Sequence, residues 1–229
     1  MKLLFADTAN LEDIKELDSM GVISGVTTNP SIIALEPKQN YAKLLHELND
    51  YCASSDLSLS VEVFETTPHK IAAEALALAS TLTHKNLHRE LYIKIPVGIE
   101  ELKIIRSLTR QHNIKINCTA CFTEMQLQAA VSAGADYVSF FYNRARDCEI
   151  NVQRVLKRTK DFIVANNSKT QIIAGSIRST QDIADAWDAG ADIVTCSPKL
   201  IKAMVQHDGT VKAIEGFAKD FAAWRETGV

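Results

Sequence analysis

The sequence of 229 residues predicts an α/β fold, a (β/α)8 TIM barrel in a single domain that spans residues 1–229. First, eight short runs rich in β-branched residues alternate with longer segments of helical periodicity. Second, no Pro-, Gly- or Ser-rich linker interrupts this alternation. Third, no GxGxxG or GxxxxGKS/T motif follows a predicted strand, which weakens the alternative of an open sheet that binds a nucleotide.

The predicted strands are short and rich in residues that favour buried strands. In chain order they cover residues 3–7, 24–29, 57–64, 91–97, 115–122, 137–143, 171–177 and 192–197. Amphipathic segments between them predict helices at residues 11–20, 68–82, 99–112, 123–133, 151–166 and 180–189. Ala133-Gly134-Ala135-Asp136 and Ala189-Gly190-Ala191-Asp192 each place a glycine where a helix stops before the next strand, which supports repeated βα units.

The last segment, about residues 210–226, predicts an additional amphipathic helix at the C-terminus. Its large apolar residues lie on one side of the helix: Ile214, Phe217, Phe221 and Trp224. A helix of this kind either closes the barrel or packs on a neighbouring subunit.

Charge and hydropathy argue against several kinds of partner. The formal net charge is −3 and no block of like charges occurs, which argues against nucleic acid and a basic membrane-binding face, so the expected ligand is small. No apolar run approaches the roughly 18 residues needed to span a bilayer. Asp7 comes too early for a signal peptide. We therefore expect a cytoplasmic protein that contacts no membrane.

Cysteine and histidine spacing indicates neither a metal site nor a redox site. Five cysteines, an odd number, favour reduced thiols. Cys118 and Cys121 form a CxxC pattern, but residues three apart on a strand face opposite sides, so we expect the thiols to be separated. His84 and His88 have metal-ligand spacing on a helix, yet no acid or thiol lies nearby in this polar stretch. We expect no metal and no cofactor.

Lys94 is the residue that most clearly indicates a catalytic site. It is the one cation in Leu91-Tyr92-Ile93-Lys94-Ile95-Pro96-Val97, an apolar run that alternates like a strand. Lys94 shares a face with Tyr92 and Pro96, opposite the face expected to pack on helices. Because removal from water disfavours an ammonium ion, a buried lysine can attack a carbonyl as the free amine. The alternative is a lysine that extends to solvent at a strand end.

The same alternation gathers other polar side chains around Lys94. Glu62 and Thr119 fall on the interior faces of their strands, and Asp7 and Asn29 end the first two strands. An amine beside two carboxylates is either a buried ion-pair network or a Schiff-base site with groups for proton transfer. Their position at strand ends favours the second. Asp7 and Glu62 are then candidate bases, Thr119 positions a water, and Asn29 holds a substrate hydroxyl.

Cationic side chains follow the late strands. Arg144 comes after the sixth predicted strand, and Ser176 and Arg178 come at the end of the seventh. Barrels commonly bind phosphate at these loops, and the rigid donors of a guanidinium suit a pair of phosphate oxygens. The alternative is that both arginines pair with surface acids, since Asp147 is near Arg144 in sequence. We predict a phosphate site.

Four motifs occur over nearly the whole chain: Asp7-Thr8-Ala9, Gly25-Val26-Thr27-Thr28-Asn29-Pro30-Ser31, Ile93-Lys94-Ile95-Pro96, and the group Arg144, Ser176 and Arg178. Together they resemble the transaldolase family, including its small members and the related fructose-6-phosphate aldolases. The resemblance implies a barrel and a metal-independent class I mechanism with Lys94 as the Schiff-base lysine. It further implies that four other residues take part in catalysis: Asp7, Glu62, Asn29 and Thr119. The implied substrate-binding residues are Thr28, Phe141, Arg144, Ser176 and Arg178.

The resemblance implies transfer of a dihydroxyacetone unit from fructose 6-phosphate or sedoheptulose 7-phosphate to an aldose phosphate. Glu62 and Phe141 resemble the transaldolase branch, because the aldolases carry glutamine and tyrosine there. A tyrosine able to protonate the enamine would divert it to free dihydroxyacetone. Phe141 is alternatively a residue of the core.

Three other functions remain open at this point. One is a fructose-6-phosphate aldolase that releases dihydroxyacetone, and another is a transaldolase for a sugar that carries a sulfonate. The third is a sugar-phosphate sensor without catalysis, because fold does not determine function. Short members of the family tend to form decamers from pentameric rings and exchange the terminal helix, so the resemblance also implies a homo-oligomer.

Overall fold

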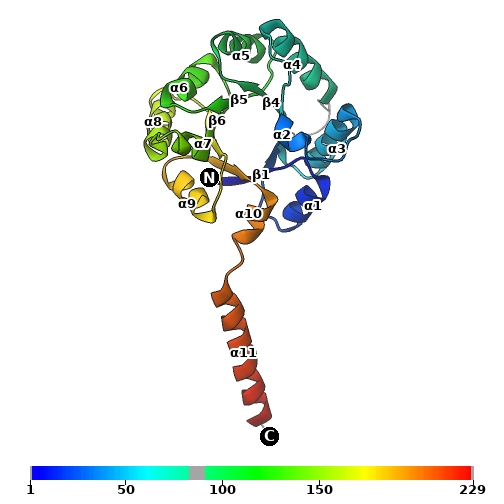
Figure 1. Cartoon of the computed structure of the whole chain (residues 1–229), viewed down its shortest axis with the longest axis vertical. Helices are drawn as coiled ribbons and strands as arrows, with labels where there is room; N and C mark the ends of the chain where they lie inside the picture. The colour runs from blue at the N-terminus through cyan, green and yellow to red at the C-terminus, as the bar shows by residue number, and fades with distance from the viewer. Residues whose placement is uncertain (1, 83–90, 228–229) are drawn as a thin grey trace.

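The computed structural model describes residues 2–82 and 91–227. These residues form a closed barrel of parallel strands in the order β1-β2-β3-β4-β5-β6-β7-β8, surrounded by helices (Figure 1). The strands are β1 Leu3–Asp7, β2 Gly25–Thr27, β3 Ser58–Glu62, β4 Leu91–Pro96, β5 Ile116–Cys121, β6 Tyr137–Phe141, β7 Gln171–Gly175 and β8 Ile193–Cys196. The predicted (β/α)8 fold is confirmed.

The helices include every one that the sequence predicts. They are α1 Leu11–Ser19, α2 Pro30–Ile33, α3 Tyr41–Ser54, α4 Pro68–Leu82, α5 Ile99–Gln111, α6 Glu124–Ala133, α7 Tyr142–Asp147, α8 Val152–Ala165, α9 Thr180–Asp188, α10 Pro198–Ala203 and α11 Asp208–Thr227. Four of them were not predicted. α2, α7 and α10 have six residues or fewer, too few to show helical periodicity. The longer α3 does bury residues at helical spacing, among them Leu44, Leu48 and Cys52.

Some strands end earlier than the sequence pattern suggests. β6 ends at Phe141 because Tyr142 already begins α7. β2 ends at Thr27, and Asn29 caps α2 by accepting a hydrogen bond on Oδ1 from the Ile32 N–H at 3.0 Å. A side-chain pattern can continue into a loop after the backbone has left the sheet, so it overestimates strand length.

The two Ala-Gly-Ala-Asp repeats have the same structural role. Gly134 and Gly190 adopt φ angles of 101° and 118°, a left-handed conformation that glycine adopts without a steric penalty. Asp136 and Asp192 then accept, on Oδ2, a hydrogen bond from the backbone N–H of the preceding strand at 2.8 and 2.9 Å. Each repeat therefore ends a helix and joins two neighbouring strands at the amino-terminal end of the barrel.

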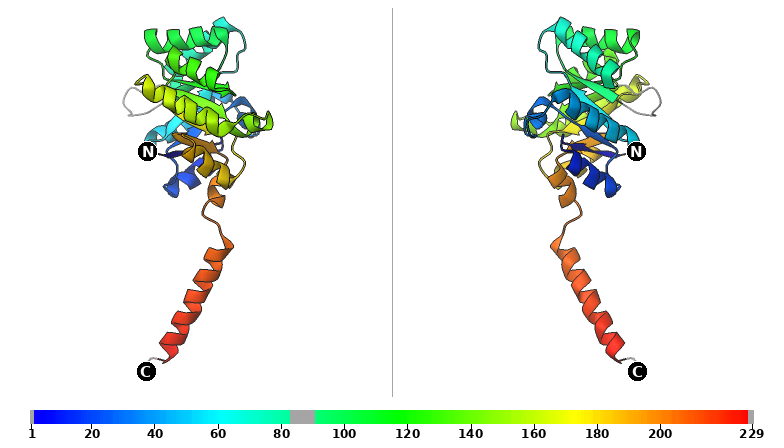
Figure 2. Two further views of the ribbon diagram at one scale, coloured as in Figure 1. Left: turned by 90° about the vertical axis from the view of Figure 1, so that its left-hand side faces the viewer. Right: turned by 90° about the vertical axis from the view of Figure 1, so that its right-hand side faces the viewer.

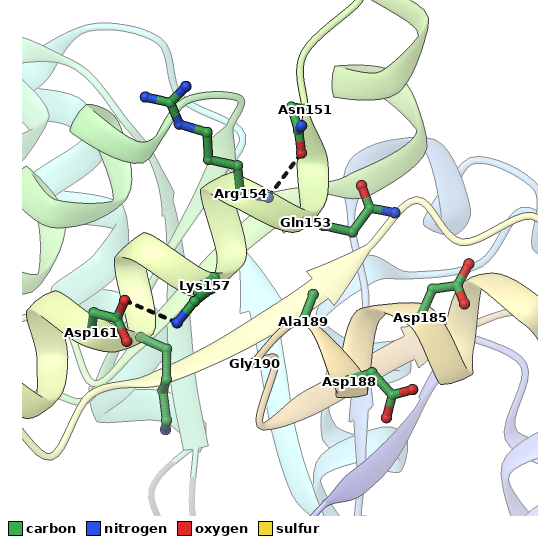
Figure 3. Close-up of a pocket in the computed structure, with 10 residues that line it drawn as sticks. Asn151, Gln153, Arg154, Lys157, Asp161, Asp185, Asp188, Ala189 and Gly190 are labelled. Carbon is green, nitrogen blue, oxygen red and sulfur yellow. Dashed lines mark hydrogen bonds and ion pairs between the residues drawn. The ribbon is translucent and has the colours of Figure 1, made fainter.

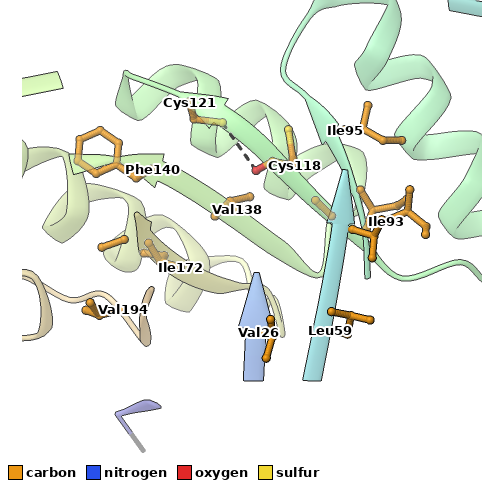
Figure 4. Packing of buried hydrophobic residues seen from close by; sticks show 14 of the residues in the cluster. Val26, Leu59, Ile93, Ile95, Cys118, Cys121, Val138, Phe140, Ile172 and Val194 are labelled. Atoms are coloured by element: carbon orange, nitrogen blue, oxygen red, sulfur yellow. Dashed lines mark hydrogen bonds between the residues drawn. The ribbon is translucent and has the colours of Figure 1, made fainter. Parts of the chain in front are cut away.

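Buried apolar side chains form two clusters, one on each side of the barrel wall. The larger, the outer cluster, lies between strands and helices and includes Ile93 and Ile95 of β4 (Figure 4). The smaller, the interior cluster, consists of Phe5, Tyr92, Tyr137, Ile173 and Ile193. The alternation predicted for β4 is thus confirmed. The interior cluster fills the barrel below Lys94, so the space around this lysine opens only toward the carboxyl ends of the strands.

β5 departs from regular alternation between Cys118 and Cys121. Its pairing with β6 shifts register there, and Ala120 has a φ of 59°. An extra residue in a bulge changes which side of the sheet the following side chains face. Both thiols therefore lie in the outer cluster (Figure 4), and the Cys118 thiol, together with burial, raises the pKa of Cys121. The prediction that these thiols face opposite sides is wrong, because it assumed an unbroken strand.

The C-terminal helix α11 projects away from the barrel (Figures 1 and 2). Its apolar stripe is exposed, with Phe217 at 71% and Trp224 at 69% of full exposure. α11 therefore does not close the barrel of its own chain, and its packing on a neighbouring subunit stays a prediction. Within residues 2–82 and 91–227, no helix is both long enough and apolar enough to cross a membrane.

Candidate active site

A pocket of about 290 Å³ opens at the carboxyl ends of the strands, above the interior cluster. Eight of the ten predicted site residues line it, namely Asp7, Asn29, Glu62, Lys94, Thr119, Phe141, Arg144 and Ser176. Thr28 and Arg178 are not among the lining residues. The closed barrel brings side chains from seven different strand ends to one small space, which makes this pocket the candidate active site.

Lys94 is buried, with 6% of its surface exposed. In the sheet it lies opposite Glu62 of β3, and its Nζ is 3.0 Å from Glu62 Oε2. The same nitrogen donates a hydrogen bond to the backbone carbonyl of Thr28 at 2.7 Å. The Thr28 hydroxyl instead donates to the Ser60 carbonyl at 3.2 Å, so Thr28 contributes its backbone rather than its side chain. Two acceptors thus hold the amine at the pocket wall.

Asp7 is the second carboxylate of the pocket. Thr27 donates a hydrogen bond to Asp7 Oδ1 at 2.7 Å. Burial raises the pKa of Asp7, while the charge of Lys94, the Thr27 hydrogen bond and the charge of Arg144 act in the opposite direction. A carboxyl group with a raised pKa and a cation nearby is suited to accept and return a proton during a reaction.

Thr119 and Asn29 both present hydrogen-bonding groups to the pocket. The Thr119 hydroxyl is buried and has no hydrogen-bond partner among the described residues. A buried hydroxyl of this kind is normally satisfied by a water or a ligand. Because Asn29 uses Oδ1 to cap α2, its amide nitrogen remains to donate to a ligand.

A polar layer, of which Ser139, Thr27 and Thr195 also line the pocket, lies outside the set of predicted site residues. Ser139 donates to Asn117 Oδ1 at 2.7 Å, and Asn117 donates to the Ser60 hydroxyl at 3.2 Å. On the opposite wall, the hydroxyls of Thr27 and Thr195 are 2.6 Å apart. Strand alternation already places Ser60 and Asn117 inside the barrel, and applied to β2, β6 and β8 it would have placed Thr27, Ser139 and Thr195 there as well.

The cationic rim is only partly directed at the pocket. The Arg144 guanidinium lies 4.7 Å from the centre of the Phe141 ring, and both residues line the pocket. Ser176 lines it too, with an unusual φ of 59° for a residue other than glycine. Arg178 instead donates to both carboxylate oxygens of Asp147, at 2.8 and 2.5 Å. Of the two arginines, only Arg144 therefore faces the pocket.

Asp182 of α9 holds the two rim loops together. It is buried at 3% exposure and accepts hydrogen bonds from the Asn143 side chain at 2.9 Å and from the backbone N–H of Arg178 at 3.1 Å. It also pairs with Arg146 at 2.9 Å. Burial would raise the pKa of Asp182, but these hydrogen bonds and the Arg146 charge lower it. No local sequence pattern indicates this role, because the partners of Asp182 come from separate βα units.

A second hollow, of about 860 Å³, lies between α8 and α9 on the outside of the barrel (Figure 3). Lys157 and Asp161 pair there at 3.4 Å, and Lys160 pairs with Asp192 at 2.6 Å. It lies away from the strand ends and from Lys94, so it is not the candidate active site. Among the described residues, no three His, Cys, Asp or Glu side chains gather as metal ligands. His84 and His88 lie outside these residues.

Comparison with known proteins agrees with this geometry. The profile of the transaldolase/fructose-6-phosphate aldolase family matches residues 4–228. A probable transaldolase of Bartonella bacilliformis is 35% identical over 224 residues, covering 98% of this chain and 97% of the relative. Probable transaldolases of Clostridioides difficile and Clostridium botulinum are 36% and 37% identical, each over 95% of both chains. The chain therefore belongs to the transaldolase/fructose-6-phosphate aldolase family and is an enzyme of this transferase and aldolase kind.

Proposed function

We propose that this enzyme is a transaldolase that uses Lys94 as a Schiff base. It moves a dihydroxyacetone unit from a ketose phosphate, fructose 6-phosphate or sedoheptulose 7-phosphate, to an aldose phosphate. The observation that carries the proposal is the buried Lys94 amine, 3.0 Å from Glu62 and in the same pocket as Asp7. A lysine that forms an iminium ion needs neighbouring groups that move protons, and this pocket supplies two.

The first step takes place at the ketose carbonyl carbon, C2. The free amine of Lys94 attacks C2, and the resulting carbinolamine loses water to give an iminium ion. Protons must leave the nitrogen and reach the departing oxygen, and Glu62 is close enough to the amine to transfer them. The buried hydroxyl of Thr119, which has no partner among the described residues, would hold the water involved.

The second step breaks the C3–C4 bond. Asp7 takes the proton of the C4 hydroxyl, C4 leaves as an aldehyde, and the electron pair of the broken bond moves into the iminium ion to form an enamine on Lys94. An aldose phosphate then enters, its carbonyl carbon bonds to the enamine, and Asp7 returns the proton to the new hydroxyl. Hydrolysis of the new iminium ion releases the product ketose and the free amine.

The fate of the enamine distinguishes transfer from release. Protonation at carbon would free dihydroxyacetone, whereas survival until an acceptor arrives gives transfer. Phe141 lines the pocket, packs edge-on against Phe122 at 5.7 Å, and has no hydroxyl that could protonate the enamine. The lack of a hydroxyl at position 141 supports transferase over aldolase activity.

Arg144 and Ser176 are the proposed binding groups for the phosphate of donor and acceptor, with Arg178 joining them when it leaves Asp147. Arg144 lines the pocket, and its fixed charge attracts an anion. A sugar sulfonate would satisfy the same donors. Comparing sulfonated with phosphorylated ketoses of equal length in the same assay would show which anion the enzyme prefers.

We also propose that a second copy of this chain covers the exposed stripe of α11. Four large apolar side chains on one helix face, each at least 60% exposed, are costly to leave in water: Ile214, Phe217, Phe221 and Trp224. The helix reaches far beyond its own barrel, as an exchanged element would (Figure 2). The cytoplasmic location expected from the sequence stays a prediction.

The decisive experiment follows glyceraldehyde 3-phosphate release from fructose 6-phosphate, with and without erythrose 4-phosphate. Release that requires the acceptor supports transaldolase activity. Release at the same rate without an acceptor, accompanied by free dihydroxyacetone, would identify an aldolase instead.

Borohydride trapping tests the role of Lys94 separately. With fructose 6-phosphate present, reduction of the iminium ion should attach substrate carbon covalently to the wild-type chain, seen as a gain in mass, and none to Lys94→Ala. Lys103→Ala is the matched control, because Lys103 is exposed and pairs with Glu100 on its own helix. A chain that binds fructose 6-phosphate but never forms a reducible imine would be a sensor rather than an enzyme of this mechanism.

A further inference from the structure

Three hydroxyl and carboxyl groups form a chain across the β8–β1–β2 side of the barrel. The hydroxyls of Thr195 and Thr27 are 2.6 Å apart, and Thr27 donates to Asp7 Oδ1 at 2.7 Å. Thr27 is 2% and Thr195 6% exposed, so bulk water competes little with these contacts. Thr195 has no part in the proposed catalytic steps.

The donor and acceptor in each of these hydrogen bonds follow from the number of hydroxyl protons available. A threonine hydroxyl has one proton to donate. Thr27 gives its proton to the Asp7 carboxylate, so Thr27 must be the acceptor in its contact with Thr195. Thr195 is therefore the terminal donor, and its dipole strengthens the hydrogen bond that Thr27 makes to Asp7.

The barrel register explains why these three residues meet. Thr27 pairs directly with Asp7 between β2 and β1, and Thr195 pairs with Phe5, one interior position below Asp7, between β8 and β1. Gly175 of β7 lies beside Thr195, because a Cβ atom there would be 3.4 Å from the Thr195 methyl group, an ordinary contact distance. The register of β2 and β8 on β1 thus brings the Thr195 hydroxyl against Thr27.

This hydrogen-bond chain uses Oδ1 of Asp7, so Oδ2 can bind a ligand. We propose that Thr195 is a positioning residue, which acts through Thr27 to orient the Asp7 carboxylate and to stabilise its ionised form for proton abstraction. This inference rests on the proposed role of Asp7 in breaking the C3–C4 bond. It adds a residue of β8 to a reaction whose other groups come from β1 to β7.

Several other groups also act on Asp7. Lys94 of β4 and Arg144 of α7 favour its ionised form, while burial disfavours it. Glu62 of β3 shares the pocket, and the Cys196 thiol of β8 is close enough for Asp7 and burial to raise its pKa to about 12, so this thiol stays neutral. Removing the Thr195 hydroxyl leaves these groups in place. The remaining effect would be a higher pKa for Asp7, because its ionised form loses support.

The test compares Thr195→Val with Thr195→Ser. Valine keeps the shape but has no hydroxyl, and we expect kcat to fall about 3- to 10-fold with little change in KM, as for the loss of one buried hydrogen bond. The acid limb of the rate profile should move to higher pH by up to about one unit. Serine keeps the donor and should restore the wild-type profile. Borohydride trapping should remain as in the wild type, since Lys94 is unaffected.

Thr170→Val is the matched control. Thr170 is also 6% exposed and donates to the Ala135 carbonyl at 2.8 Å, but it lies at the start of β7, away from the pocket. Equal pH profiles for Thr195→Val and Thr170→Val would overturn the inference, as would failure of Thr195→Ser to restore the profile. If Thr195→Val does not fold, Thr195→Ala replaces it, because alanine cannot overpack the site.

Asp7→Asn separates failure of this inference from failure of the proposed function. An Asp7→Asn enzyme with wild-type turnover would show that Asp7 is not the base, and the role of Thr195 would fall with it. An inactive Asp7→Asn enzyme beside a Thr195→Val enzyme with the wild-type pH profile would overturn only the role of Thr195.

Discussion

Arg178 and Asp147 form a two-point ion pair on the rim of the pocket, in which Nη1 and Nη2 of the guanidinium each bind one carboxylate oxygen. The two residues are separated by 31 positions in the chain and come from different βα units. Both are about half exposed. Arg178 thus already binds an internal anion. If Arg178 binds the substrate phosphate, as in the proposed function, that phosphate must displace Asp147 or share the arginine with it.

We predict that Asp147→Asn lowers KM for fructose 6-phosphate by about 2- to 5-fold, a small effect because exposed ion pairs contribute little. The asparagine no longer competes with phosphate for the guanidinium. Initial rates at varied fructose 6-phosphate would measure it, with Asp161→Asn, an exposed acid paired with Lys157, as the control. A raised KM would instead mean that Asp147 orients Arg178 for the ligand.

We predict that Phe141→Tyr shifts the enzyme from transfer toward release. The new hydroxyl would lie near the enamine on Lys94 and could protonate it, so free dihydroxyacetone should increase relative to transferred product. The ratio of the two products with erythrose 4-phosphate present measures this partition. Phe122→Tyr is the control, since Phe122 packs on Phe141 without lining the pocket. An unchanged ratio would refute this role for Phe141.

Glu62→Gln should slow the enzyme about 10- to 100-fold, in the range of a lost general acid–base group. Glutamine keeps the shape of the side chain but cannot carry protons between water and the amine. The rate of borohydride-trappable imine formation should fall together with turnover. Glu100→Gln on the surface of α5, which pairs with Lys103, should leave both rates unchanged. Normal imine formation in Glu62→Gln would limit Glu62 to a later step.

Asp182→Asn should lower the free energy of unfolding by about 2 kcal/mol at pH 7, because an amide cannot accept all the hydrogen bonds that the buried carboxylate accepts. The pKa of Asp182 is lowered in the folded state, so its stabilising contribution is present above its ordinary value of 3.8. That contribution is lost as the pH falls below 3.8 through the folded-state pKa.

Urea unfolding at pH 7 and in the acid range would measure this difference. The difference in free energy of unfolding between wild type and Asp182→Asn should decrease as the pH decreases. The control Asp188→Asn, on the exposed side of α9, should have the wild-type free energy of unfolding at every pH. A difference in free energy of unfolding that does not depend on pH would mean that Asp182 stabilises the protein through packing and not through its ionised carboxylate.

Light scattering should give the enzyme a mass several times that of one chain. Replacing Phe217 and Phe221 together by glutamate should reduce this mass, because charges would enter the face proposed to contact a second copy. Lys219→Glu, on the opposite side of α11, should leave the assembly intact. A wild-type monomer would exclude the proposed contact.

Much of the fold was predictable from the sequence because barrel strands and helices have strong local patterns. The alternation of β4 placed Lys94 inside the barrel, and the same reasoning brought Glu62 and Thr119 to the pocket that the structure contains. The roles of these residues stay predictions. The pattern failed at Cys118 and Cys121, because a bulge adds a residue to the strand without a local signal.

The sequence by itself determined the barrel, the family and the position of Lys94 inside the barrel, since all three depend on short motifs and on side-chain periodicity. Only the tertiary structure decided that Arg178 pairs with Asp147 and that Thr195 reaches Thr27. Thr27 and Thr195 are 168 residues apart and meet because β8 closes the barrel against β1, beside β2. Contacts of this kind depend on strand register and closure, which no local pattern of residues contains.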